Sequence, residues 1–323
     1  MSKILDDLQN NYLKKTRKLL INLINKYDIP SAHYLKDFSF TEGKLLRPTF
    51  YFLFRNNNNK ITYQDYQIAM SLEMLHMSTL IHDDIIDDSD MRRGISSLQS
   101  KFGKDVAVYS GDYLITLFLT LLSSTKDIKL IQSNISTMRH ILQGELNQKA
   151  IRYHIPMDLV SYYYSIYGKT AALFALSCYE GAYLNNWDVK KCTIAKKIGY
   201  HIGVAFQIYD DILDYHISDS YTPQKPMFND ISEGVYTLPL ILLYKKIPQK
   251  LSHYLYHNKE KLISEENLMT IVNLINDYNV IDESKKIANS YIHKAMIETE
   301  QLANSKYLQE GILEVFTKLK YKI

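Results

Sequence analysis

Glycine and proline are scarce in this chain, with 11 Gly and 7 Pro among 323 residues. The tight turns of β-sandwiches, barrels and Gly-rich doubly wound folds depend on these residues, so their scarcity argues against all three architectures. Hydrophobic residues make up 46% of the chain and charged residues 23%, which excludes disorder as its overall state. We therefore expect long helices joined by short connections.

Cysteine is also rare, and neither sign of charge dominates. Cys178 and Cys192 are too few for a disulfide framework or a zinc site, so a reducing compartment is expected. The 38 basic and 35 acidic residues give a net charge of +3, which does not indicate a nucleic-acid partner. Any anion must therefore bind at a local cluster of cations.

Signals for export or membrane insertion are missing from the sequence. The N-terminal segment has no apolar core typical of a signal peptide, and Arg17 is its only Arg before Arg47, unlike an Arg-rich transit peptide. The most apolar stretch, residues 114–122, is too short to span a bilayer. We expect a soluble protein without a transmembrane segment, complete as written.

Helical spacing of apolar residues recurs along most of the chain. It predicts helices within residues 1–40, 63–91, 105–124, 129–150, 157–185, 195–215 and 238–323. Residues 218–234 contain Pro223, Pro226 and Gly234 and form the longest expected loop, a candidate functional flap. One all-α domain spanning residues 1–323 is the simplest interpretation.

Two aspartate motifs have the same spacing, DDIID at residues 83–87 and DDILD at residues 210–214. On a helix, Asp83 and Asp87 project from one face, as do Asp210 and Asp214. Clustered carboxylates destabilise a helix unless a cation neutralises them, and Mg²⁺ binds one or two carboxylates together with substrate phosphates. The sequence therefore predicts a diphosphate site bridged by metal between two helices.

Two other interpretations of these motifs fit the sequence less well. A solvated acidic face is disfavoured because apolar residues flank both motifs. A calcium loop starting at Asp83 needs Gly at its sixth position and Glu at its twelfth, which are Asp88 and Gly94 here.

A stripe of functional residues extends from the first motif along the same helical face. Glu73, His76, Leu80, Asp83 and Asp87 follow one another at intervals of three or four residues. Although a single His is usually structural, this position favours a role for His76 in the site.

Cations and hydrogen-bonding side chains suited to phosphate are distributed among the two motifs. They are Lys44, Arg47, Arg92, Arg93, Lys169, Thr170, Gln207 and Lys225. Arg binds phosphate with two parallel hydrogen bonds and Lys acts as a point charge. Each residue alone is a weak signal, but the set is consistent with diphosphate binding.

The chain resembles the trans-type polyprenyl (isoprenyl) diphosphate synthases from about residue 41 to residue 239. The motifs that carry the resemblance are GKLLRP at 43–48, HDDIIDD at 82–88 with RRG at 92–94, GDYL at 111–114, GExxQ at 144–148, GKT at 168–170, FQIYDDILD at 206–214, and the segment from Asp230 through Gly234 to Pro239. The order and approximate separations of these motifs also match the family.

The resemblance implies an all-α isoprenoid synthase fold around a deep central cavity, formed as a homodimer. It implies a prenyltransferase that condenses isopentenyl diphosphate head-to-tail onto an allylic diphosphate, with about two or three Mg²⁺ ions per active site. Lys44, Arg47, His76 and Arg93 then belong to the isopentenyl diphosphate site, and Arg92, Lys169, Thr170, Gln207 and Lys225 to the allylic diphosphate site. Asp83, Asp87 and Asp210 are the implied metal ligands, supported by Asp84 and Asp214, and Asp211 completes the catalytic set.

Product length is expected to depend on residues below the first motif. Ser78 stands five residues before Asp83, about 7.5 Å along the helix. Short-chain members of the family resemble one another in carrying bulky side chains near this position, whereas Ser78 is small. Met74 and Leu75 lie about one turn deeper. We expect a long product, such as the precursor of a quinone side chain.

Some positions depart from the family pattern, and two other functions fit the sequence less well. Ile95-Ser96-Ser97 follows the RRG segment, Gln224 precedes Lys225, and Val235 follows Gly234. A terpene cyclase needs only one such acidic motif and no isopentenyl diphosphate site, so Lys44, Arg47 and Arg93 argue against it. A silent partner subunit typically loses both motifs, whereas this chain keeps both.

The expected location is the plastid stroma, with a bacterial-type cytoplasm as the alternative. The 27 Tyr residues and the abundant Ile, Lys and Asn are typical of AT-rich codon usage. Such a bias is characteristic of an organelle or endosymbiont genome.

Overall fold

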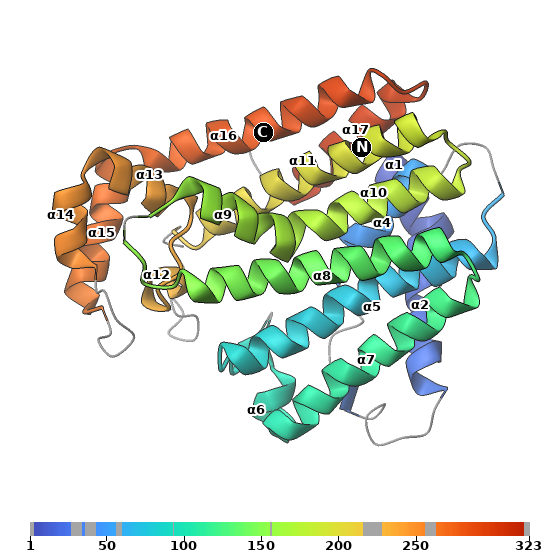
Figure 1. Ribbon diagram of the computed structural model, residues 1–323, viewed down its shortest axis with the longest axis horizontal. Coiled ribbons are helices and arrows are strands. Elements are labelled where there is room, and N and C mark those ends of the chain that lie inside the picture. Colours follow the sequence, from blue (N-terminus) through green and yellow to red (C-terminus); the bar gives the residue numbers. More distant parts are fainter. Residues whose placement is uncertain are drawn as a thin grey trace. The chain divides into compact units, whose positions relative to one another are not determined.

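The computed structural model describes residues 3–26, 34–35, 43–55, 60–92, 94–155, 157–215, 228–255 and 263–319. The described elements are almost all helical (Figure 1). They are α1 (Lys3–Leu8), the π-helix η1 (Gln9–Leu13), α2 (Lys14–Asn25), α4 (Leu46–Arg55), α5 (Tyr63–Ile86), β1 (Met91–Arg92), β2 (Ile95–Ser96), α6 (Leu98–Phe102), α7 (Lys104–Ser124), α8 (Ile128–Ala150), α9 (Leu159–Ile166), the π-helix η2 (Tyr167–Ala171), α10 (Ala172–Leu184), α11 (Val189–Leu213), α12 (Asn229–Ser232), α13 (Leu238–Lys246), α14 (Pro248–Tyr254), α15 (Glu265–Asp277), α16 (Val280–Thr299) and α17 (Ser305–Lys318).

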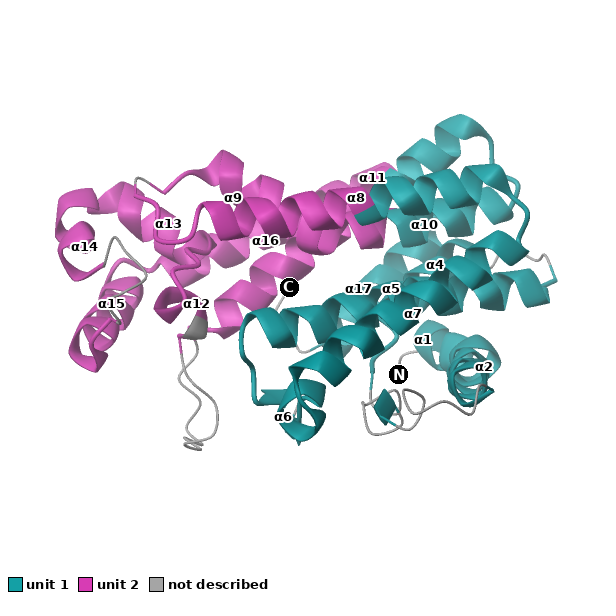
Figure 2. Cartoon of the chain, turned by 60° about the horizontal axis from the view of Figure 1, so that its bottom comes forward, with its two compact units in different colours: residues 1–138, 176–196, 301–320 teal, residues 139–175, 197–300, 321–323 magenta. Residues whose placement is uncertain are grey.

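The chain divides into two compact units, coloured separately in Figure 2. Unit 1 comprises residues 1–138, 176–196 and 301–320, and unit 2 comprises residues 139–175, 197–300 and 321–323. Three of the boundaries fall within α8, α10 and α11. The single domain over residues 1–323 stays a prediction.

Helix α5 forms the centre of unit 1. Apolar residues occupy all of its sides, which is typical of a buried helix, and it packs along α7. A reciprocal capping box between Thr62 and Asp65 begins the helix. The prediction of a helix up to residue 91 is wrong, because α5 ends at Ile86 and Met91 pairs with Ser96 in a short antiparallel ladder. Gly94, with φ of 83°, allows the turn between these two strands.

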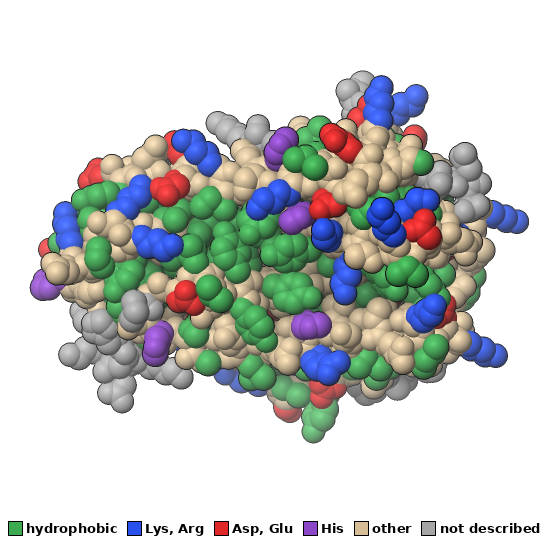
Figure 3. All heavy atoms as spheres, turned by 45° about the horizontal axis from the view of Figure 1, so that its top comes forward, with side chains coloured by type: hydrophobic (Ala, Val, Ile, Leu, Met, Phe, Trp, Pro, Cys, Tyr) green, Lys and Arg blue, Asp and Glu red, His purple; other side chains and the backbone are tan. Residues whose placement is uncertain are grey.

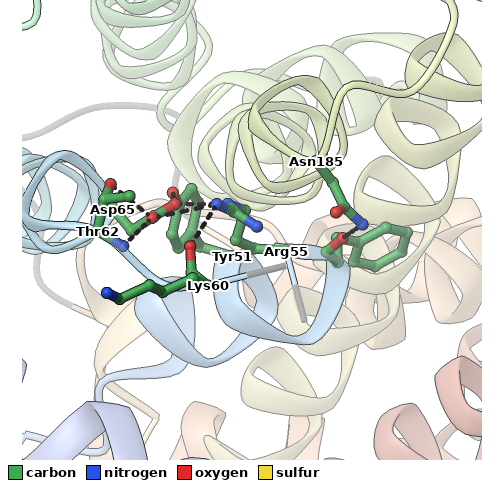
Figure 4. Close-up of polar contacts among 7 residues, drawn as sticks. Tyr51, Arg55, Lys60, Thr62, Asp65 and Asn185 are labelled. Carbon is green, nitrogen blue, oxygen red and sulfur yellow. Dashed lines mark hydrogen bonds and ion pairs between the residues drawn. The ribbon is translucent and has the colours of Figure 1, made fainter. Parts of the chain in front are cut away.

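A buried polar network joins α4 to the start of α5 (Figure 4). The Nε of Arg55 lies 2.6 Å from Oδ1 of Asp65, and the hydroxyl of Tyr51 donates to the same oxygen at 2.7 Å. The backbone N–H of Thr62 donates to Oδ2 of Asp65 at 2.7 Å. Asp65 thus accepts hydrogen bonds from α4 and from its own N-cap, which fixes α4 against α5.

Helix α7 is long and apolar enough to cross a membrane by length and composition, which the prediction from residues 114–122 did not anticipate. Leu114, Phe118 and Leu122 are buried, and α7 packs along α5. A core helix with one face packed inside a bundle has the same composition, so this result is weak support for a membrane span.

The two ends of the described chain meet in unit 1. The backbone N–H of Leu5 in α1 donates to Oε2 of Glu314 in α17 at 2.9 Å. The first N–H groups of a helix have no partner within it, so this carboxylate satisfies one of them and its charge favours the N-terminus of α1. Helices α1 and α17 are therefore held together.

In unit 2, aromatic side chains of α9, α11 and α16 form a connected cluster. The ring centroids of Tyr163 and Tyr291 lie 6.0 Å apart, and those of Tyr200 and Tyr291 lie 6.4 Å apart. Figure 3 shows a face of the molecule on which hydrophobic side chains gather among Lys, Arg and His. Tyr163, Tyr200 and Tyr291 therefore contribute to the packing of these three helices.

Candidate active site

The first aspartate motif lies at the C-terminal end of α5, in unit 1. His76, Leu80, Asp83 and Asp87 are half-buried, and their spacing of three or four residues places them on one face. Asp87 is the C-cap of the helix. Glu73, one turn before His76, is buried. The helix therefore presents two carboxylates and an imidazole along one partly accessible face.

Asp84 points away from that face and is paired with Arg92. Asp84 is 3% exposed, and Nε of Arg92 lies 2.8 Å from both of its carboxylate oxygens. The Nη2 atom of Arg92 lies 2.6 Å from Oδ1 of Asp84. The predicted diphosphate ligand Arg92 is thus held by a carboxylate of the first motif in this structure.

Arg47 and His76, both predicted to bind isopentenyl diphosphate, lie in direct contact. Nη1 of Arg47 is 3.0 Å from Nε2 of His76. A guanidinium can only donate, so Nε2 accepts and the imidazole is neutral with its proton on Nδ1. Lys44 is exposed in the segment before α4. Arg47, by contrast, is only 8% exposed at the start of α4.

The second motif lies at the end of α11, in unit 2. Gln207, Asp210 and Asp214 are half-buried and share one helical face, whereas Asp211 is buried. Oδ1 of Asp211 accepts from Nε2 of Gln207 at 2.8 Å. Its Oδ2 accepts from the hydroxyl of Tyr162 at 2.5 Å.

A hydrogen-bonded chain connects η2 to this motif. The hydroxyl of Thr170 donates to Oε1 of Gln207, which donates in turn to Asp211. Burial raises the pKa of Asp211 to about 7, against the opposing effect of its hydrogen bonds to Tyr162 and Gln207. Desolvation and the carboxylates of Asp214 and Asp211 raise the pKa of Asp230 well above its usual range. The negative charge around the second motif is therefore unfavourable without a cation.

Lys169 is placed by a close approach of two backbones. A Cβ atom on Gly168 would lie 2.4 Å from the carbonyl oxygen of His140 and 2.6 Å from the Cα of Gly144, so glycine is required where η2 meets α8. Nζ of Lys169 donates to Oε1 of Gln148 at 3.3 Å and lies 3.7 Å from Glu145. The GExxQ and GKT segments thus form one local arrangement in unit 2.

Comparison with known proteins identifies the family to which the chain belongs. The family described as polyprenyl synthetase matches residues 31–275. The chain belongs to the polyprenyl synthetase family. It is therefore a prenyltransferase with the all-α isoprenoid synthase fold, as the sequence predicted.

Individual relatives in the polyprenyl synthetase family cover most of the chain. Heptaprenyl diphosphate synthase component 2 of Bacillus subtilis is 32% identical over 272 residues, which are 82% of this chain and 75% of the relative. A prenyl transferase of Cyanidium caldarium is 27% identical over 318 residues, covering 98% of this chain and 95% of the relative. The crystal structure of a polyprenyl synthase from Caulobacter crescentus, complexed with calcium and isoprenyl diphosphate, aligns with a TM-score of 0.88 at 25% identity, covering 100% of this chain and 98% of that one.

The family uses divalent metal ions, and the donor set here fits such an ion. In the described ranges, no three His, Cys, Asp or Glu side chains are grouped so that they could hold a metal by themselves. Each motif instead offers two half-buried carboxylates. Mg²⁺ typically takes one or two carboxylates and completes its shell with water and phosphate oxygens. A metal that binds together with diphosphate therefore suits these residues.

Two predicted site residues cannot be placed, and the structure adds two others. Arg93 and Lys225 were predicted to bind diphosphate and lie outside the described residues. The structure adds Tyr162 and Asp230, whose backbone N–H donates to Oδ2 of Asp214 at 3.3 Å. The family motif beginning at Asp230 could have indicated the latter, whereas nothing distinguishes Tyr162 among 27 tyrosines. The roles of the individual residues remain predictions.

Proposed function

We propose that the chain condenses isopentenyl diphosphate head-to-tail onto an allylic diphosphate, releasing diphosphate and forming an all-trans polyprenyl diphosphate. The observation that carries the proposal is the pair of equivalent carboxylate faces, Asp83 with Asp87 and Asp210 with Asp214, in a member of the polyprenyl synthetase family. Asp83, Asp87 and Asp210 would hold Mg²⁺, which stabilises the departing diphosphate as a Lewis acid.

The remaining residues bind and orient the substrates. Arg47 and Lys44 supply positive charge for isopentenyl diphosphate, and neutral His76 supplies an Nδ1–H donor. Lys169 supplies a cation for the allylic diphosphate, with Arg92 once it leaves Asp84. The oxygens of Thr170 and Gln207 are dipoles that can stabilise the allylic cation, and exclusion of water protects that cation from hydrolysis.

We further propose a product of more than about twenty carbons, given the small side chain at Ser78 one and a half turns below Asp83. Ser78, Met74 and Leu75 are buried on α5. A quinone side-chain precursor made in a plastid would agree with the AT-rich composition.

The decisive experiment incubates the purified chain alone with Mg²⁺, labelled isopentenyl diphosphate and farnesyl diphosphate, and weighs the products by mass spectrometry. A ladder of masses that differ by one isoprene unit supports the proposal and gives the product length. The printed name of the Bacillus subtilis relative includes "component 2", so the second candidate is a subunit that needs a partner chain. Turnover by the chain alone would exclude that candidate, whereas cyclised hydrocarbons would indicate a cyclase.

A further inference from the structure

Four side chains of unit 2 form a continuous series of hydrogen bonds at the second motif. The hydroxyl of Tyr162 donates to Oδ2 of Asp211 at 2.5 Å, and Nε2 of Gln207 donates to Oδ1 of the same carboxylate at 2.8 Å. The hydroxyl of Thr170 donates in turn to Oε1 of Gln207. We call these four side chains the Asp211 network. Tyr162 of α9 and Thr170 of η2 thus contact two residues of α11 that lie one turn apart.

The carboxylate of Asp211 determines the direction of these hydrogen bonds. An ionised carboxylate can only accept, so the amide nitrogen of Gln207 faces Asp211 and its amide oxygen faces Thr170. Because an amide oxygen also can only accept, the hydroxyl proton of Thr170 is directed toward Gln207. The oxygen of Thr170 therefore has only lone pairs to offer to any other group.

Tyr162 is buried and its helix is held in place at both ends. The side chain of Asp158 caps the first turn of α9 by accepting from two backbone N–H groups, and Nδ2 of Asn147 in α8 donates to the hydroxyl of Ser165 at 2.8 Å. Tyr162 is 4% exposed and lies on the buried side of α9. Since Asp211 is also buried, whereas Gln207 lies on the half-buried face of the motif, Tyr162 influences that face only through Asp211.

We infer that Tyr162 is a positioning residue for the proposed reaction and acts through Asp211. Its hydrogen bond keeps the Asp211 network in the direction that leaves the oxygen lone pairs of Thr170 and Gln207 available to the substrate carbon that becomes cationic. Preorganised oxygen dipoles stabilise such a cation, whereas a hydroxyl proton in the same place would repel it. This role rests on the proposed function, in which those two oxygens stabilise the allylic cation.

Loss of the Tyr162 hydroxyl should affect the cation more than the neutral substrate. Oδ2 of Asp211 then loses its donor in a buried environment, which is unfavourable for a charged acceptor. The carboxylate is free to rotate, and the amide of Gln207 is no longer held in one orientation. Because the allylic carbon carries its charge only as the diphosphate departs, kcat should fall while the KM values change little.

Steady-state kinetics of Tyr162→Phe, which removes a single oxygen atom, test this role. Assays at about pH 8.5 keep Asp211 ionised in the wild type, because burial raises its pKa only to about 7. We expect kcat to fall about tenfold or more, with KM for either substrate changed by less than about threefold. Tyr163→Phe removes the neighbouring hydroxyl, which belongs to the aromatic cluster with Tyr291, and should keep the wild-type kcat.

A double-mutant cycle tests whether Tyr162 acts through Asp211. Asp211→Asn places an amide where the carboxylate was, and an amide can also donate, so the orientation of Gln207 is no longer imposed. If the two residues act as one unit, adding Tyr162→Phe to Asp211→Asn should lower kcat by less than about twofold further. Losses that multiply in the double variant would show that Tyr162 acts elsewhere and would overturn the inference.

Calorimetry with two unreactive analogues of the allylic diphosphate gives a readout that does not depend on turnover. One analogue carries an ammonium nitrogen in place of the carbon that becomes cationic, and the other is neutral and has sulfur in place of the bridging oxygen. In the presence of Mg²⁺, Tyr162→Phe should reduce the preference for the ammonium analogue about tenfold and leave the affinity for the neutral analogue almost unchanged. Tyr163→Phe should keep the wild-type preference. A general structural defect would weaken both analogues alike.

Three results would count against this role of Tyr162. Equal kcat values and equal analogue preferences in Tyr162→Phe and Tyr163→Phe would overturn it. A Tyr162→Phe chain that does not fold, as judged by circular dichroism, would also overturn it, because the hydroxyl would then be needed for the fold. A wild type without turnover would contradict the proposed function and this role together, whereas an active wild type with indistinguishable variants would contradict the role of Tyr162 alone.

Discussion

At the scale of single residues, each buried aspartate of the two motifs has its own hydrogen-bonding partners. Asp84 and Asp211 are the buried second residues of the two motifs, and each is satisfied locally, Asp84 by Arg92 and Asp211 by Tyr162 and Gln207. The first and last residues of each motif remain half-buried. This division of roles follows from helical geometry, because the second position lies about 100° from the first.

Removal of the Asp83 carboxylate tests the assignment of the first motif. Asp83→Ala should lower kcat by orders of magnitude, because a metal ligand is lost, while the half-buried position tolerates alanine. Circular dichroism should show unchanged helix content. Asp88→Ala, an exposed aspartate just beyond the motif, is the control and should keep near-normal turnover. A folded Asp83→Ala enzyme with wild-type kcat would contradict the assignment.

Glu180 provides a pH-dependent contribution to stability that the sequence did not indicate. It is fully buried on α10, accepts from the side-chain amide of Asn134, and has its pKa raised by burial to about 8 from 4.5. Between these pH values the unfolded chain releases the proton and the folded chain keeps it. Stability from this group is therefore complete below about pH 4.5 and lost by about pH 8.

Glu180→Gln keeps the shape of the side chain and removes its titration. Between pH 5 and pH 8 the free energy of unfolding of the wild type should fall by about 1.4 kcal/mol per pH unit more than that of the variant. Urea denaturation at several pH values measures this difference. The exposed Glu265→Gln serves as the control, and parallel pH profiles for wild type and Glu180→Gln would refute the expectation.

At the scale of elements, periodicity located most helices but not their ends. The helices predicted at 105–124 and 129–150 correspond to α7 and α8, because their apolar spacing is unbroken. Residues 157–185 were predicted as one segment, but η2 interrupts it where Gly168 approaches Gly144. Helix α11 begins at Val189, six residues before the predicted start at 195. The contact of Asp84 with Arg92 depends on how the chain folds after α5, so the periodicity of the sequence could not predict it.

Helix α5 carries the prediction on product length. Ser78→Phe places an aromatic ring at a buried position of this helix, five residues before Asp83, and should shorten the products by several isoprene units. Chromatography of dephosphorylated products measures the change. Ser71→Phe, also buried but seven residues earlier on α5, distinguishes general misfolding from a block near the motif. Unchanged product length in an active Ser78→Phe enzyme would contradict the role of Ser78.

At the scale of the whole molecule, the exposed face of α8 supports the predicted homodimer. Ile128, Ile135, Leu142 and Leu146 are all at least half exposed and recur at intervals of seven or four residues. A stripe of aliphatic side chains along one helix is typical of a helix–helix interface. The unexpectedly apolar α7 is adjacent in sequence and exposes Tyr109 and Leu119.

Charge placed in this stripe should disrupt the dimer. Leu142→Asp combined with Leu146→Asp introduces two carboxylates where apolar contact is expected, so the dimer should dissociate at micromolar concentration. Size-exclusion chromatography with light scattering measures the mass. Val189→Asp, an exposed apolar position at the start of α11, should leave the mass unchanged. A monomeric wild type, or a variant of unchanged dimeric mass, would contradict the interface.

The hydrogen bond from Leu5 to Glu314 joins residues that are 309 positions apart in the chain. The N-terminus of α1 therefore acquires this partner only after α17 has been synthesised and folded. Contacts of such sequence separation form late and slowly. A chain that lacks α17 should consequently leave the first N–H groups of α1 without this carboxylate, which destabilises the start of that helix.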